Sequence, residues 1–88
     1  MLRNLGAVYT NAKLYRQALA VTERIMMVAP HLIEERRTRA IALAELNRLP
    51  EAIQELEAYL RLAPDDSADK QRAEEQLNAL RMRLAGLN

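Results

Sequence analysis

The feature that most constrains this 88-residue chain is an internal repeat with a period of 34 residues. When the sequence is shifted by that period, Ala29-Pro30 falls on Ala63-Pro64 and Ala18 falls on Ala52 without a gap. Further matches join Leu19 to Ile53, Val8 to Ala42, Tyr9 to Leu43 and Gly6 to Ala40. A repeat of this length is one supersecondary unit, and it buries its apolar face by stacking on a neighbouring unit. We therefore expect a short stack of similar units.

The composition of the chain favours helices within each unit. Hydrophobic residues make up 50% of the chain, yet it has no Trp or Phe and only three Tyr, so its apolar content is mainly Ala and Leu. These residues favour helices, whereas strands favour β-branched and aromatic residues. Apolar residues recur at helical spacing, which predicts an all-α fold of antiparallel helix pairs with five helices. We expect these helices over about 2–12, 15–29, 32–46, 50–63 and 68–85.

Proline, serine and glycine mark the expected helix ends. Pro30 and Pro64 cannot continue a helix, so each one closes a unit. Pro50 suits the first turn of a helix, where its missing N–H is not needed. Ser67 is expected to cap the last helix, and Gly86 is expected to end it.

These residues resemble the tetratricopeptide repeat (TPR) family. The first copy matches the family pattern through Leu5, Gly6, Tyr9, Tyr15, Ala18 and Pro30, and the second through Ala40, Leu43, Leu49, Ala52 and Pro64. The resemblance implies one TPR domain over 1–88, folded as a short superhelix. Repeat 1 would cover about 1–32, repeat 2 about 33–66, and a capping helix about 67–86. The implied function is a non-catalytic scaffold or adaptor that binds a partner protein or peptide through its helix faces.

A narrower resemblance is to the C-terminal TPR segment of bacterial transglutaminase-like proteins. It is carried by the strings at 1–30, 36–46 and 52–66. In those proteins the segment follows an N-terminal transglutaminase-like domain, which this sequence does not contain. The resemblance implies an alternative function as the C-terminal accessory domain of a larger protein, whose chemistry would lie in that N-terminal domain.

The residue types needed for catalysis are nearly absent. The chain has no Cys, one His and one Ser, and both His31 and Ser67 stand where helix capping explains them. One His cannot build a zinc site, so we expect no metal, no cofactor and no enzyme activity. Most helix glutamates lie in solvent, and Glu51, Glu55 and Glu57 are expected to do so.

The charge of the chain is nearly balanced, with a formal net charge of +1. Residues 1–48 hold eight Lys or Arg against four Asp or Glu, and residues 49–88 hold five against eight. A nucleic-acid surface would need a basic stripe without that acidic half, so we expect no nucleic-acid partner. No apolar run approaches the roughly 18 residues of a membrane span. We therefore expect a cytoplasmic protein with no membrane partner.

The TPR resemblance also implies a binding surface. In TPR arrays the first helix of each unit lines the concave face. By that resemblance, the partner-binding groove is expected to hold Arg3, Asn11, Arg37, Thr38, Ile41, Glu45 and Arg72. TPR domains that hold a chaperone's C-terminal carboxylate use Lys, Arg and Asn at set positions. Ala7, Thr38 and Ala68 stand at three of those positions, so the resemblance to that subgroup is weak.

Two arginines occupy positions where the family usually has large apolar residues. Arg36 and Arg39 are expected to face the stack and to cover the adjacent helix with their aliphatic stems. Their expected ionic partners are Glu34, Glu35 and Glu45. For Arg37, recognition of a carboxylate or phosphate and simple pairing within the chain both remain open.

One end of the stack is expected to expose apolar residues. About three units are normally needed to bury a continuous core, and this chain has two and a closing helix. Leu2, Leu5 and Met27 are therefore predicted to form a docking or dimer face. Met27 corresponds to the charged Arg61 in the second copy, and methionine adapts well to contact surfaces. The partner of this face would be a second copy or an N-terminal domain.

Overall fold

The computed structural model describes residues 9–10, 12–65 and 67–86. Within them the chain is all-α, as predicted, with four full helices: α2 (Tyr15–Val28), α3 (Glu34–Glu45), α4 (Leu49–Leu62) and α5 (Ala68–Leu84). The expected number of five is therefore wrong for the described part of the chain. The first expected helix, at about 2–12, lies mostly outside that part, and of its residues Tyr9 and Thr10 are helical. The other four expected ranges agree with the observed helices to within two residues.

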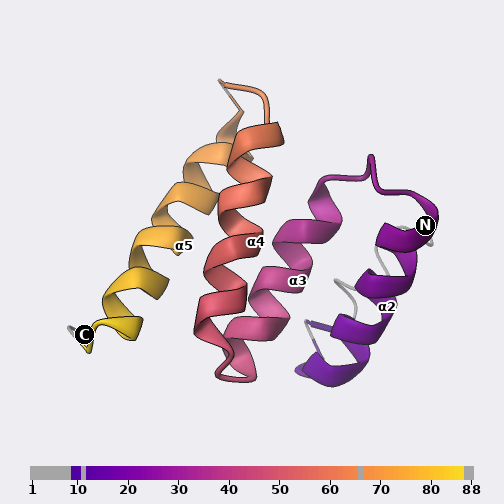
Figure 1. Ribbon diagram of the computed structural model, residues 1–88, viewed down its shortest axis with the longest axis horizontal. Helices are drawn as coiled ribbons and strands as arrows, with labels where there is room; N and C mark the ends of the chain where they lie inside the picture. The colour runs from indigo at the N-terminus through magenta and orange to yellow at the C-terminus, as the bar shows by residue number, and fades with distance from the viewer. Residues whose placement is uncertain (1–8, 11, 66, 87–88) are drawn as a thin grey trace.

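The helices lie side by side in the order of the sequence, and each runs antiparallel to the one before it (Figure 1). The α3 helix packs between α2 and α4, and α5 packs on α4. Every second helix therefore runs in the same direction, so α3 and α5 start at the same end of the molecule (Figure 1). This arrangement gives α3 and α5 one shared face.

The backbone repeats the 34-residue period in the two turns that separate the helices of each pair. Lys13 and Asn47 are the non-glycine residues with positive φ in the described part, at 61° and 63°. In both turns the next N–H donates to a carbonyl five residues back, from Leu14 to Tyr9 and from Arg48 to Leu43, each at 2.8 Å. This pattern is a Schellman ending, which satisfies carbonyls left open at a helix C-terminus. The repeat is therefore structural as well as sequential.

Most of the expected helix boundaries are confirmed. Pro50 lies in the first turn of α4, and the Ser67 hydroxyl accepts a hydrogen bond from the Lys70 N–H at 3.0 Å. Gly86 ends α5 with a φ of +77°, a conformation that L side chains rarely adopt. The capping interpretation of His31 is wrong, because α3 begins after Ile33 and has no side-chain cap.

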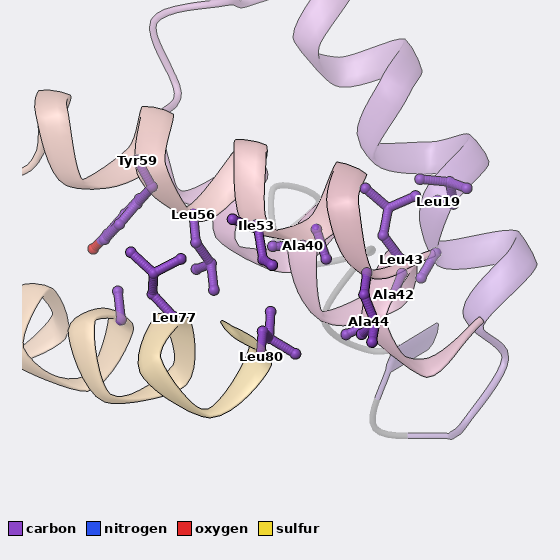
Figure 2. Close-up of a cluster of buried hydrophobic side chains, with 14 of the residues drawn as sticks. Leu19, Ala40, Ala42, Leu43, Ala44, Ile53, Leu56, Tyr59, Leu77 and Leu80 are labelled. Atoms are coloured by element: carbon purple, nitrogen blue, oxygen red, sulfur yellow. The ribbon is translucent and has the colours of Figure 1, made fainter. Parts of the chain in front are cut away.

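The core is built from small residues and leucines on facing sides of the helices (Figure 2). Leu56, Leu77 and Leu80 point toward one another between α4 and α5. The buried residues are Ala18, Leu19, Thr22, Glu35, Ala40, Ala42, Leu43, Ala44, Leu49, Ala52, Ile53, Leu56, Tyr59, Ala63, Ala73, Leu77 and Leu80. Ala40 and Ala52 are both buried, in agreement with the small residues that the repeat pattern requires where two helices meet.

An ionic cluster joins α3 to α4 beside the apolar core. Arg36 Nη1 donates to Glu55 Oε1 at 3.1 Å, and Arg39 Nη1 donates to Glu55 Oε2. Arg39 Nη2 also lies 3.7 Å from Glu23 Oε2 of α2. The Glu55 side chain is only 12% exposed, so the expectation that it lies in solvent is wrong. The expected partners of Arg36 and Arg39 were also wrong, because both guanidinium groups reach across to α4 and not along α3.

We predict that Glu55→Gln lowers the free energy of unfolding by about 1–3 kcal/mol, because Arg36 and Arg39 then lose their shared anion in a partly buried site. Urea unfolding followed by circular dichroism measures this. The matched control is Glu51→Gln in the same helix, because Glu51 pairs with Arg48 in the open and such pairs contribute little. A Glu55→Gln variant as stable as the wild type would contradict the prediction.

Candidate binding groove

The shared face of α3 and α5 carries polar side chains at helical spacing. On α3, Arg37, Ile41 and Glu45 recur every four residues and therefore share one side of the helix, and Thr38 is three residues before Ile41 at the edge of that side. On α5 the corresponding stripe consists of Asp69, Arg72, Gln76, Ala79 and Arg83. We call the surface between these two stripes the α3–α5 groove.

A pocket of about 170 Å³ lies in the α3–α5 groove. Its apolar lining comes from all three adjoining helices: Ala40, Ile41 and Ala44 of α3, Leu56 of α4, and Ala79 and Leu80 of α5. Glu45, Gln76 and Arg83 complete the lining. Because Glu45, Ala79 and Arg83 are exposed, the pocket opens to solvent. We call this space the α3–α5 pocket.

A hydrogen-bonded network links α3, α4 and α5 along the N-terminal half of the groove. Arg37 of α3 donates from Nε to Gln76 Oε1 at 3.4 Å, and its Nη1 lies 3.5 Å from Asp69 Oδ1. The same Nη1 lies 3.9 Å from Glu34 Oε1. Tyr59 of α4 donates from its hydroxyl to Glu34 Oε2 at 3.0 Å. Burial and this hydrogen bond together raise the pKa of Tyr59 to about 12, so its hydroxyl stays protonated as a donor.

The structure brings together five of the seven groove residues that the sequence predicted. Arg37, Thr38, Ile41 and Glu45 lie on α3, and Arg72 lies on α5 with its side chain 69% exposed. The other two, Arg3 and Asn11, lie outside the described residues, as do Leu2 and Leu5. Thr38 donates to the Glu34 carbonyl at 3.3 Å, a bond within its own helix. Arg37, whose role was left open, pairs within the chain.

The sequence reading missed most of the α5 side of the groove. Asp69, Gln76, Ala79 and Arg83 were not proposed, although they follow the helical spacing that leads away from Arg72. That spacing was the available signal. The sequence analysis assigned α5 to a capping helix, so only Arg72 of that helix was included in the expected groove.

A second hollow lies between α2 and α4, beside the ionic cluster. Glu23, Met26, Met27, Arg39 and Glu55 line it, and its volume is about 350 Å³. The Met27 side chain is highly exposed, at 84%, and its neighbour Val28 is equally open. Exposure of Met27 agrees with the predicted docking or dimer face, but a role in docking stays a prediction.

Neither surface holds a constellation typical of catalysis or metal binding. Across the described ranges, no group of three or more His, Asp or Glu side chains could hold a metal ion. No helix in those ranges is long and apolar enough to cross a membrane. The side chains of Glu45 and Arg83, which flank the α3–α5 pocket, have no hydrogen bond or ion pair with any other described residue.

One carboxyl group next to the network is buried without a full set of partners. Glu35 follows Glu34 in the first turn of α3, is only 5% exposed, and its Oε1 has no hydrogen-bond partner among the described residues. Burial raises the pKa of Glu35 above its ordinary value of 4.5, and the negative charge of Glu34 raises it further. The protonated form of Glu35 is therefore favoured by folding.

A family model described as tetratricopeptide repeat matches residues 5–84, nearly the whole chain. The chain belongs to the tetratricopeptide repeat family. TPR modules generally bind other proteins and are typically not catalytic by themselves, which fits the residues on the α3–α5 groove. Three structural features agree with this match: the antiparallel order of the helices, the equivalent turns 34 residues apart, and the small residues buried between helices.

The chain is also similar to a curated protein named UPF0162 protein from Xylella fastidiosa (strain Temecula1). The two are 34% identical over 64 residues, which cover 73% of this chain and 23% of that relative. The chain thus spans less than a quarter of the length of the relative it matches. No solved structure matches the chain significantly.

We predict that Glu35→Gln raises the melting temperature near neutral pH. A carboxyl with a raised folded-state pKa contributes stability that is present below pH 4.5, and that stability is lost as the pH rises through the raised pKa. Gln stays neutral, so its advantage over Glu should be largest at neutral pH and should shrink as the solution is acidified. Melting curves at several pH values, with exposed Glu75→Gln as control, measure this. A Glu35→Gln advantage that is the same at every pH would contradict the prediction.

Proposed function

We propose that this chain is a non-catalytic protein-interaction module that binds a segment of a partner protein in the α3–α5 groove. The observation that carries the proposal is the α3–α5 pocket, an open apolar space of about 170 Å³ between exposed polar side chains. Binding sites in proteins are typically concave and mostly apolar, with a few polar groups that orient the ligand. The TPR membership of the chain supports a protein as the ligand.

The arrangement of the remaining polar residues supports a scaffold or adaptor role over an enzymatic one. His31 lies in the link before α3 and Ser67 in the link before α5, so they are one repeat apart in the stack. Nucleophilic catalysis requires such groups within hydrogen-bond reach of one another. Among the residues that the structure describes, His31 and Ser67 are therefore not paired as base and nucleophile.

Site-specific photo-crosslinking in cells tests this function. A photoreactive phenylalanine analogue in place of Arg72, which is exposed on the groove face of α5, should form covalent adducts with another protein. The neighbouring Gln71 is also exposed but points away from the groove stripe, so the same analogue there should form few adducts. Equal crosslinking at both positions, or none at Arg72, would show that the groove is not the binding surface.

A second candidate function is that of an accessory domain in a larger protein, in which Met27 docks against a neighbouring domain. Two observations favour it: the chain spans only 23% of its relative, and Met27 is exposed beside Val28. The narrower resemblance described above would make the neighbour a transglutaminase-like domain, which would carry the chemistry. Leu2 and Leu5 would belong to the same docking face. A second copy of the chain is the alternative occupant.

We predict that Met27→Lys weakens this docking without unfolding the module, because its counterpart in the second repeat is the exposed Arg61. Sedimentation velocity of the isolated chain reports self-association, and limited proteolysis of the full-length protein reports docking between domains. Gln17→Lys, at another exposed position of α2, is the control. If Met27→Lys changes neither measurement, the docking face is wrong.

A further inference from the structure

The size of the α3–α5 pocket matches a single side chain. An apolar cavity of about 150 Å³ is large enough to hold benzene, and this pocket has about 170 Å³. Three alanines, Ala40, Ala44 and Ala79, create the space because their side chains end at Cβ. Ile41 and Leu80 provide apolar walls. One leucine, methionine or phenylalanine of a partner would fill this space and be removed from water.

The charges beside the pocket are of opposite sign and lie on opposite helices. Glu45 is on α3 and Arg83 is on α5, and both line the pocket. Neither side chain has an ion pair or hydrogen bond within the described part of the chain. A bound segment would therefore meet an acidic wall on one side and a basic wall on the other.

The cations at the opposite end of the groove are already paired. Arg37 contacts Asp69, Gln76 and Glu34, and Asp69 is shared with Arg72 at 3.7 Å. A free carboxyl terminus would have to compete with these carboxylates for the arginines. An internal segment places no such demand on them.

On the function proposed above, we infer that the α3–α5 pocket takes an internal partner segment with one bulky apolar side chain, flanked by an acidic residue on one side and a basic residue on the other. The apolar side chain fills the space between Ile41, Ala79 and Leu80. The acidic residue faces Arg83, and the basic residue faces Glu45. Charge complementarity on both walls orients the segment, and burial of the apolar side chain provides most of the affinity.

The probe is a labelled, alanine-rich helical peptide with one leucine, a glutamate on one flank of that leucine and a lysine on the other. Fluorescence anisotropy measures its binding to the chain. Replacing the leucine by alanine should weaken binding at least about tenfold, because the buried side chain is lost. Ala79→Leu, which fills the pocket from within, should weaken binding of the leucine peptide by a similar factor. Asn78→Leu, at an exposed position of α5 outside the pocket lining, should leave it unchanged.

A charge exchange tests the orientation with two further peptides, one with glutamate on both flanks and one with lysine on both. The wild type should prefer the mixed peptide. Glu45→Lys should prefer the all-glutamate peptide, and Arg83→Glu the all-lysine peptide, each by about two- to fivefold. A helix can enter the groove in either direction, so this design does not depend on peptide polarity.

In the peptide experiments, the inference is overturned by no binding of the leucine peptide, by equal binding of the leucine and alanine peptides, or by an unchanged peptide ranking in the two charge variants. The proposed function has a separate readout in the crosslinks from Arg72. If those crosslinks form and Ala79→Leu leaves them intact, the groove binds protein but the pocket is not its selective feature. If they do not form, the proposed function fails, and the inference fails with it.

Discussion

The close contact of the helices through alanines is the constraint on which the rest of this structure depends. Ala18, Ala40, Ala52 and Ala73 are completely or almost completely buried, one on each of α2 to α5. A side chain that ends at Cβ lets two helix backbones approach, and packed helices in proteins lie about 8–10 Å apart. The period of 34 residues returns such a residue to the interface in each repeat. Glu74 stands 34 residues after Ala40 and is exposed. The side of α5 that corresponds to the α4-facing side of α3 is therefore charged and open to solvent.

The ionic cluster at Glu55 is a second solution to the same packing problem. Two arginines stand where TPR units usually have large apolar side chains, and their guanidinium groups converge on one carboxylate of the neighbouring helix. Removing water from these charges costs free energy, and a shared and hydrogen-bonded anion offsets that cost. Because Arg39 also reaches Glu23, the cluster ties α2 to the second repeat. The cluster thus adds contacts of defined geometry among three helices to the apolar packing between them.

Local information in the sequence was enough for the helices and turns, because those depend on residues close together in the chain. Pro50, Ser67 and Gly86 act on their own helix ends, and the two Schellman turns recur at the 34-residue period of the sequence. The TPR resemblance assigned Arg37, Ile41 and Glu45 to one helix face. Partners across helices could not be predicted this way. In the sequence, Glu55 has the same helical spacing as an exposed glutamate, and its two arginine partners lie on another helix. The sequence likewise does not distinguish Arg37, which is paired within the chain, from Arg83, whose side chain has no partner among the described residues.

The distribution of paired and unpaired groups separates the parts of the groove that hold the fold from the part that is free to bind. Around Arg37, the charged groups already have partners: Arg37 contacts Gln76 and Asp69 of α5 and Glu34 of its own helix, and Tyr59 of α4 donates to Glu34. Beside the pocket, Glu45 and Arg83 are solvated and the apolar lining is partly open. A ligand gains most where the protein has not already satisfied its own groups, provided that the surrounding scaffold is rigid enough to hold the site in place. The α3–α5 pocket lies beside unpaired groups and next to the Arg37 network that links α3 to α5.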